Sequence, residues 1–172
     1  MRRILLPFLM IFMLISDSLY VEFVRLPFVS EDQMAVPRFL LLALVFMAAY
    51  INQRHAVVYG LIFGLLYDIN YTQILGVYMF GYAALCYLLS KAFKVLQTNA
   101  FVVIVLSVIA VAVLEFYVYG VQLVITPSIL SFNAFVIERL LPTLALNCCA
   151  SILTLFLFKR YFVNYKRRFL DE

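Results

Sequence analysis

Charged side chains are scarce in this sequence of 172 residues. Asp, Glu, Lys and Arg together make up 13% of it, against roughly 25% in ordinary soluble domains. Hydrophobic residues reach 67%, and the mean hydropathy is +1.07. A soluble domain of this length could not bury so much apolar surface, whereas a lipid bilayer can surround it. The composition therefore excludes a soluble domain and predicts a single integral membrane domain that covers residues 1–172.

Residues that perform chemistry are equally rare. The only histidine, His55, lies in a short polar turn, and tryptophan is absent. Cys86, Cys148 and Cys149 all lie inside apolar runs, without the spacing of metal ligands or of a disulfide framework. The sequence contains no Gly-x-Ser-x-Gly, His-Glu-x-x-His, phosphate-loop or dinucleotide motif. We therefore expect no enzyme, no metal site and no cofactor.

Long apolar stretches, in contrast, follow one another along the whole chain. They do not alternate with polar residues, as the strands of a membrane barrel would. They predict an all-α polytopic membrane protein, a six-transmembrane-helix bundle. The expected spans are residues 4–24, 38–51, 56–69, 74–90, 100–125 and 134–158.

The second and third spans are short, at about 14 residues each, against about 20 for the hydrocarbon core. Three explanations stay open: the bilayer thins, neighbouring protein covers the helix ends, or the two form a hairpin that does not cross. Pro142 lies inside the sixth span and predicts a kink there. Arg2 and Arg3 before an apolar run also resemble a secretory signal. Because the run continues to Val24, we expect an uncleaved span.

The basic residues predict the orientation of the chain. If the N-terminus is cytoplasmic, ten of the thirteen basic residues fall on the cytoplasmic side. The three on the outer side are Arg25, Arg38 and Arg139. By the positive-inside rule, both termini are cytoplasmic and the number of spans is even. We expect a multi-pass protein of the cell (plasma) membrane.

Three carboxylates lie within the expected spans, where an ionisable group is costly and normally faces protein or water. Counted from the cytoplasmic end of each helix, Asp17, Asp68 and Glu115 lie roughly 18–22 Å deep. Glu138 and Arg139 begin the sixth span on the same side. The pattern predicts a polar layer, or a shallow outward-facing cavity, in the outer half of the membrane.

That layer has more than one interpretation. Each carboxylate could lie near an interface or pair with Arg25, Arg38 or Arg139. The layer could also be a binding site, a partner contact or a proton relay. No histidine or lysine lines it, which disfavours the relay.

Glycines mark an expected helix contact in the third span. Gly60 and Gly64 form a GxxxG pair on one helix face, which lets another backbone approach closely. Asp68 is four residues further and extends the same face. Gly76 begins the fourth span. We expect these four residues to serve helix packing or partner binding.

The segment Gly60-Leu-Ile-Phe-Gly64-Leu-Leu-Tyr-Asp68, followed by Ile74-Leu75-Gly76, resembles the central motif of the MreD family of rod shape-determining membrane proteins, most closely its Bacillus-type members. The layout of the whole chain fits that family, and the motif itself lies within residues 56–90. By resemblance, Gly60, Gly64, Asp68 and Gly76 are the motif positions. Asp17 and Glu115 are not part of that motif.

The resemblance also implies a fold and a function. MreD-like proteins are non-catalytic members of the machinery, the elongasome, that builds lateral peptidoglycan. They associate with MreC, and through it with MreB, RodA and a class B penicillin-binding transpeptidase. Their fold is similar to the substrate-binding subunits of energy-coupling-factor transporters. Two hypotheses follow: a membrane scaffold that packs against MreC, or a solute- or lipid-binding subunit of a transporter.

Overall fold

The computed structural model describes residues 5–23, 34–72, 74–125 and 131–169, and these residues form helices without any strand. The ends of the expected first span, residues 4 and 24, and the basic residue Arg25 lie outside the described residues. In chain order the elements are α1 (Leu5–Phe23), α2 (Phe39–Tyr50), α3 (Gln53–Tyr71), α4 (Val77–Leu96), α5 (Ala100–Ile125), α6 (Phe132–Ala134), the π-helix η2 (Phe135–Leu140) and α7 (Leu141–Phe169).

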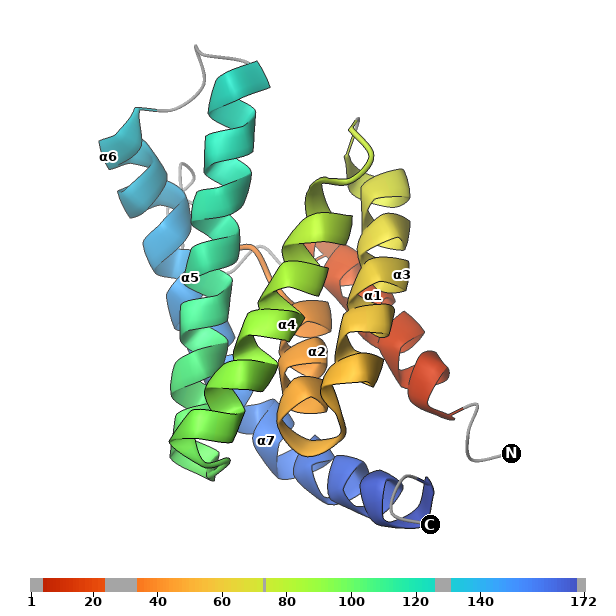
Figure 1. Ribbon diagram of the computed structural model, residues 1–172. Coiled ribbons are helices and arrows are strands. Elements are labelled where there is room, and N and C mark those ends of the chain that lie inside the picture. The colour runs from red at the N-terminus through yellow and green to blue at the C-terminus, as the bar shows by residue number, and fades with distance from the viewer. Residues whose placement is uncertain (1–4, 24–33, 73, 126–130, 170–172) are drawn as a thin grey trace.

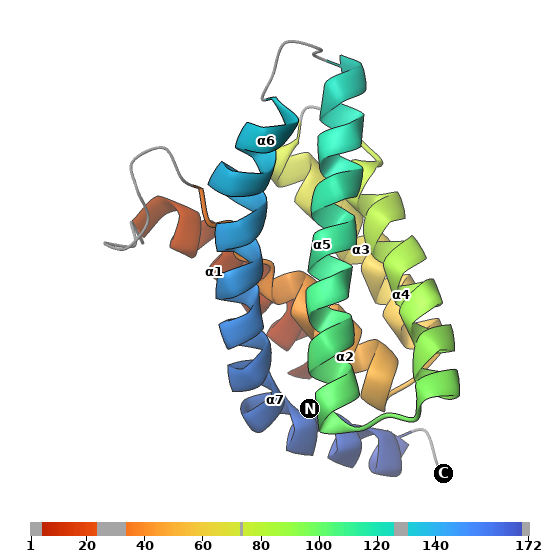
Figure 2. The same cartoon turned by 90° about the vertical axis from the view of Figure 1, so that its left-hand side faces the viewer.

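The helices run alternately in opposite directions along the bundle (Figure 1). Helices α1, α3 and α5 run upward in that view, and α2, α4 and the continuous helix from α6 to α7 run downward. Helix α1 therefore begins, and α7 ends, at the same end of the bundle, which we name the lower end. Helices α3 and α5 end at the opposite, upper end. The last turns of α7 lie across the lower end (Figures 1 and 2).

Helix α2 occupies the centre of the bundle (Figure 2). It packs against α1, α3, α4, α5 and α7. Every side chain from Leu40 to Ala48 is buried, so this helix is apolar on all sides rather than on one stripe. Of the explanations for the short second span, the structure shows the second one, because neighbouring helices cover α2 along its length.

Three of the described helices are long and apolar enough to cross a membrane: Val77–Leu96, Ala100–Ile125 and Phe132–Phe156. Leu6–Tyr20 and Phe39–Tyr50 are shorter apolar helices. The chain is thus a helical membrane protein.

Several helix boundaries differ from the spans expected from hydropathy, and α3, α4 and α7 end at Tyr71, Leu96 and Phe169, beyond the expected residues 69, 90 and 158. Helix α3 begins at Gln53, so the polar residues expected to form a turn are its first turn, which Asn52 caps by accepting the Arg54 N–H. Helix α4 begins at Val77, three residues after the expected Ile74. Gly76 prevents the helix from beginning earlier, because its φ of +108° is a left-handed, non-helical conformation that favours glycine.

Pro142 lies just after the π-helical turn η2 in an otherwise continuous helix. Proline has no N–H to donate, and its ring crowds the carbonyl four residues earlier. That carbonyl belongs to Glu138, inside η2, where the helix widens. The predicted irregularity in the sixth span is therefore a π-helical turn that leaves the Glu138 carbonyl available to another segment.

Candidate functional site

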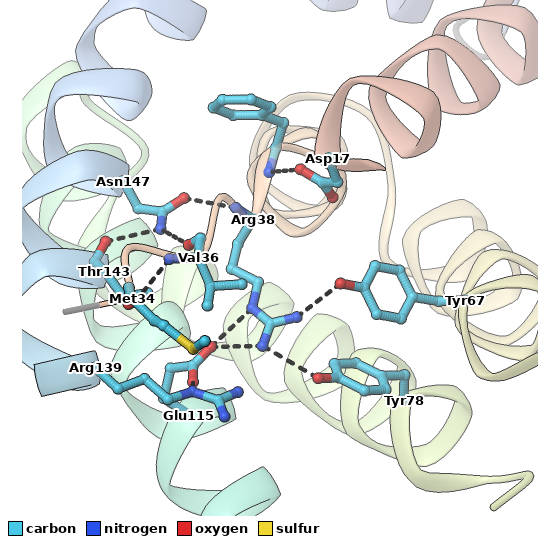
Figure 3. A network of polar contacts seen from close by, with 11 residues as sticks. Asp17, Met34, Val36, Arg38, Tyr67, Tyr78, Glu115, Arg139, Thr143 and Asn147 are labelled. Atoms are coloured by element: carbon cyan, nitrogen blue, oxygen red, sulfur yellow. Dashed lines mark hydrogen bonds and ion pairs between the residues drawn. The ribbon is translucent and has the colours of Figure 1, made fainter. Parts of the chain in front are cut away.

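A fully buried arginine forms the centre of the polar layer (Figure 3). Arg38 immediately precedes α2, and its side chain is only 1% exposed. Its guanidinium donates to the hydroxyls of Tyr67 in α3 and Tyr78 in α4, both at 3.1 Å. The same group lies over the two rings, 5.8 Å and 5.1 Å from their centroids. Aromatic faces and hydroxyls therefore solvate one side of the cation.

Glu115 of α5 supplies the opposite charge. Its Oε1 accepts from Nε of Arg38 at 2.8 Å and lies 2.6 Å from Nη2. Its Oε2 accepts from Nε of Arg139 in η2 at 3.0 Å. This fully buried carboxylate therefore joins two cations from different parts of the chain. Because an unpaired buried charge costs several kcal/mol, each member depends on the others.

An extended segment, Met34–Arg38, lies beside the helix formed by η2 and α7. The Met34 N–H donates to the carbonyl that Pro142 leaves free, that of Glu138, at 2.8 Å. The Val36 N–H donates to Oγ1 of Thr143 at 3.1 Å. The Glu138 carbonyl and the Thr143 hydroxyl thus supply hydrogen bonds that a non-helical backbone must find inside a membrane protein.

Asn147 completes the attachment of the extended segment (Figure 3). Its Oδ1 accepts from the Arg38 N–H at 2.8 Å. Its Nδ2 donates to the Val36 carbonyl at 2.9 Å and to the Thr143 carbonyl at 2.8 Å. One buried amide thereby fixes the backbone from which the Arg38 side chain projects.

Two further carboxylates cap helices rather than pair with cations. Asp17 of α1 accepts from the N–H groups of Phe39 and Leu40 at 2.7 and 3.2 Å, at the start of α2. Asp68 of α3 accepts from three N–H groups at the start of α4, those of Gly76, Tyr78 and Met79, at 2.9–3.0 Å. A carboxylate at a helix N-terminus satisfies free N–H donors and complements the helix dipole.

The glycines of the third span lie against α4 of the same chain. A Cβ added at Gly64 would meet the Met79 Cα and the Tyr78 carbonyl oxygen at 2.6 Å. At Gly60 it would meet the backbone of Ala83 at 3.3 Å. The glycine face thus sets the close approach of α3 and α4, with Asp68 at its upper end.

The structure brings three of the expected polar residues together and separates others. Glu115 pairs with Arg38 and Arg139, and Asp17 accepts from the two backbone N–H groups that follow Arg38, those of Phe39 and Leu40 (Figure 3). Glu138 contributes its main-chain carbonyl, and no described residue pairs with its side chain. Asp68 forms a separate cap between α3 and α4.

Sequence reasoning offered pairing with Arg38 or Arg139 as one interpretation of the carboxylates, and the structure shows both pairs for Glu115. It missed Tyr67, Tyr78, Thr143 and Asn147. Thr143 and Asn147 lie four residues apart in an apolar helix and so share one face, a pattern visible in the sequence. For the two tyrosines no sequence signal separates a network member from an ordinary core residue.

The chemistry of this network is structural. Arg38 and Glu115 have their charged atoms occupied by each other and by neighbours. Among the described residues, no group of three or more His, Cys, Asp or Glu could hold a metal ion. The arrangement connects α1, α2, α3, α4, α5 and the helix formed by η2 and α7 to one another through the extended segment and its neighbours.

Comparison with known proteins identifies the family. The family model described as "rod shape-determining protein MreD" matches residues 2–165. The Rod shape-determining protein MreD of Bacillus subtilis (strain 168) is 54% identical over 172 residues, which cover 100% of both chains. No solved structure matches the chain. With a family model covering nearly the whole sequence and a relative matched along its full length, the chain belongs to the MreD family of rod shape-determining proteins.

Proposed function

We propose that this chain is a non-catalytic membrane scaffold of the bacterial cell-elongation machinery, supporting rod shape and lateral peptidoglycan synthesis through association with MreC. The observation that carries the proposal is the match to the family across residues 2–165. Through MreC the scaffold connects indirectly to MreB, RodA and a class B penicillin-binding transpeptidase.

The buried network supports a scaffold rather than a binding pocket. The carboxylates of Asp17, Asp68 and Glu115 all bind groups of the chain itself. Charged groups committed in this way hold the helices in place and are not available to a transported solute. The alternative, a solute- or lipid-binding transporter subunit, needs polar ligands that face a cavity. A small solute retained in native mass spectra of the purified chain would favour that alternative.

The proposal includes a topology of six crossings with both termini in the cytoplasm. The alternating helix directions support it, because α1 begins and α7 ends at the lower end (Figure 1). In this topology the polar network lies toward the outer leaflet. The likeness of the fold to the substrate-binding subunits of energy-coupling-factor transporters stays a prediction.

Reporter fusions test the topology. A reporter active only in the cytoplasm, fused after Glu172 or inserted at Gln97 between α4 and α5, is expected to be active. An export-dependent phosphatase inserted at Ser128, between α5 and α6, is expected to be active in turn. The opposite pattern at Gln97 or Ser128 would contradict this topology.

Co-purification with MreC tests the scaffold itself. The chain, affinity-tagged at its C-terminus, is expected to retain MreC in mild detergent, whereas an equally expressed unrelated single-span protein is not retained. Variants at Gly60 and Gly64 cannot locate the partner face, because both glycines pack against α4 of the chain itself.

Exposed positions on separate helices locate the partner face instead. Phe80 in α4, Ile109 in α5 and Ile152 in α7 are exposed large side chains on three different helices. Their single replacement by alanine should leave the fold intact, and only the variant on the partner face should lose MreC. Failure of the unchanged chain to retain MreC would refute the proposal.

A further inference from the structure

Arg139 has an unused hydrogen-bonding face. Its Nε donates to Oε2 of Glu115 at 3.0 Å, and its side chain is 21% exposed. Neither terminal amino group has a partner among the described residues, and both are drawn without a contact in Figure 3. Arg38, in contrast, uses all three of its nitrogens.

The geometry of that face suits an anion with two oxygens. A guanidinium presents its donors as a planar fork, and phosphates and carboxylates bind it through two parallel hydrogen bonds. Glu115 occupies the Nε side of the Arg139 fork, and the pair of terminal amino groups has no partner in the part of the chain that the structure describes. In a membrane protein a guanidinium is costly unless its donors reach water or an anion.

The position along the helix puts an anion within reach. Arg139 follows Phe132, the first residue of α6, by seven residues, which places it about 10 Å below the upper helix end. Long basic side chains at such positions reach the headgroup level. Glu138, although adjacent in sequence, points to a different helix face.

The surface around Arg139 is apolar. Val136 and Pro142, three residues before and after Arg139 on the same helix face, are apolar and partly exposed. An acyl chain can lie along these side chains while the attached headgroup meets the guanidinium. A lipid therefore fits both the polar and the apolar part of this surface.

From this arrangement we infer that Arg139 is a binding site for the phosphate of a membrane phospholipid at the upper end of the bundle. The terminal amino groups bind two phosphate oxygens, and Glu115 holds the guanidinium in place from its other side. The buried network thus serves as the support of a lipid site, independently of whether the chain binds MreC.

Native mass spectrometry of the full chain in neutral detergent tests the inference. The chain is incubated with an equimolar mixture of phosphatidylglycerol and a phosphate-free diglucosyl diacylglycerol. The unchanged protein is expected to retain the phospholipid preferentially. Arg139→Gln is expected to lower phospholipid retention about tenfold or more, because a bidentate charged contact is lost. Arg139→Lys, which keeps the charge, should retain an intermediate amount.

Arg54→Gln is the matched control, since Arg54 is an exposed arginine in the first turn of α3 at the lower end. It should retain as much phospholipid as the unchanged protein. Thermal unfolding of each variant in the same detergent reports whether the fold is intact. If Arg139→Gln does not fold, Arg139→Lys decides the matter, because phospholipid retention equal to that of the unchanged protein would place the lipid elsewhere.

Several results would overturn the inference. Equal retention of both lipids by the unchanged protein would show that phosphate is not recognised. Equal phospholipid retention by Arg139→Gln would place the lipid elsewhere. Binding of inorganic phosphate as strong as that of the phospholipid would make the ligand a free anion. Loss of MreC by Arg139→Gln without a change in lipid would assign this face to a carboxylate of the partner.

Discussion

Replacing Gly64 by alanine tests the contact between α3 and α4 at its tightest point. The added Cβ would lie 2.6 Å from the Met79 Cα and from the Tyr78 carbonyl oxygen. Carbon atoms pack at about 3.5–4.0 Å, so the two helices must separate locally by roughly 1 Å. Both obstructing atoms are backbone, and no side-chain rotation can relieve the clash. We expect an overpacking cost near 3 kcal/mol, the upper part of the usual range.

The neighbouring glycine provides the control. At Gly60 the added Cβ would meet the Ala83 backbone and the Cys86 Sγ at 3.3 Å, which requires a shift of only a few tenths of an ångström. Alanine gains about 1 kcal/mol over glycine in helix propensity. We therefore expect Gly60→Ala to be nearly neutral, and Gly64→Ala to lose a net of about 2 kcal/mol.

Thermal unfolding in detergent, followed by the helical circular dichroism signal at one scan rate, measures the difference. For a protein of this size, 2 kcal/mol corresponds to a melting temperature lower by roughly 4–8 °C. Gly60→Ala should melt close to the unchanged protein. Equal melting of both variants, or a larger loss for Gly60→Ala, would refute the packing of α3 against α4 described above.

Three other perturbations follow from the polar contacts. Glu115→Gln leaves the buried Arg38 without its counter-charge and should cost about 3–5 kcal/mol, seen as a lower melting temperature or as loss of folded protein from the membrane. Asp68→Asn turns amide hydrogens toward the N–H donors that begin α4 and should cost about 1–3 kcal/mol; a melting temperature equal to that of the unchanged protein would contradict its role as a cap. Pro142→Ala restores a backbone N–H that competes for the carbonyl bound by Met34, so amide hydrogen exchange at Met34 should accelerate, whereas unchanged exchange would show that the proline does not keep that carbonyl available.

Much of the helical architecture could be predicted from hydropathy alone. The fifth span, residues 100–125, coincides with α5. The start of α4 could not be predicted in this way. Ile74 and Leu75 are apolar, and it is the backbone conformation of Gly76 that makes the helix begin at Val77. The short second span was also recognised, but its enclosure by five helices depends on contacts between distant parts of the chain.

The candidate site was only partly predictable for the same reason. Depth along the helices placed Asp17 and Glu115 in one layer. Their partners are the start of α2 and the Arg38 guanidinium, 77 residues from Glu115 in sequence. Hydropathy assigns an arginine at a span end to the water side. Burial of Arg38 becomes favourable only when a carboxylate and two tyrosine hydroxyls from three other helices converge on it.

The attachment of the extended segment has a consequence for how the chain is made. The backbone of Arg38 is bound by Asn147, which is synthesised 109 residues later. At about 5–20 residues per second, the ribosome needs roughly 5–20 s to cover that interval. During that time α2 can enter the membrane, but the segment before it lacks its amide partner and, for the first 77 of the 109 residues, its counter-ion Glu115 as well. Burial of Arg38 is therefore a late step of biogenesis, and a nascent chain arrested before α7 would carry an unfinished centre.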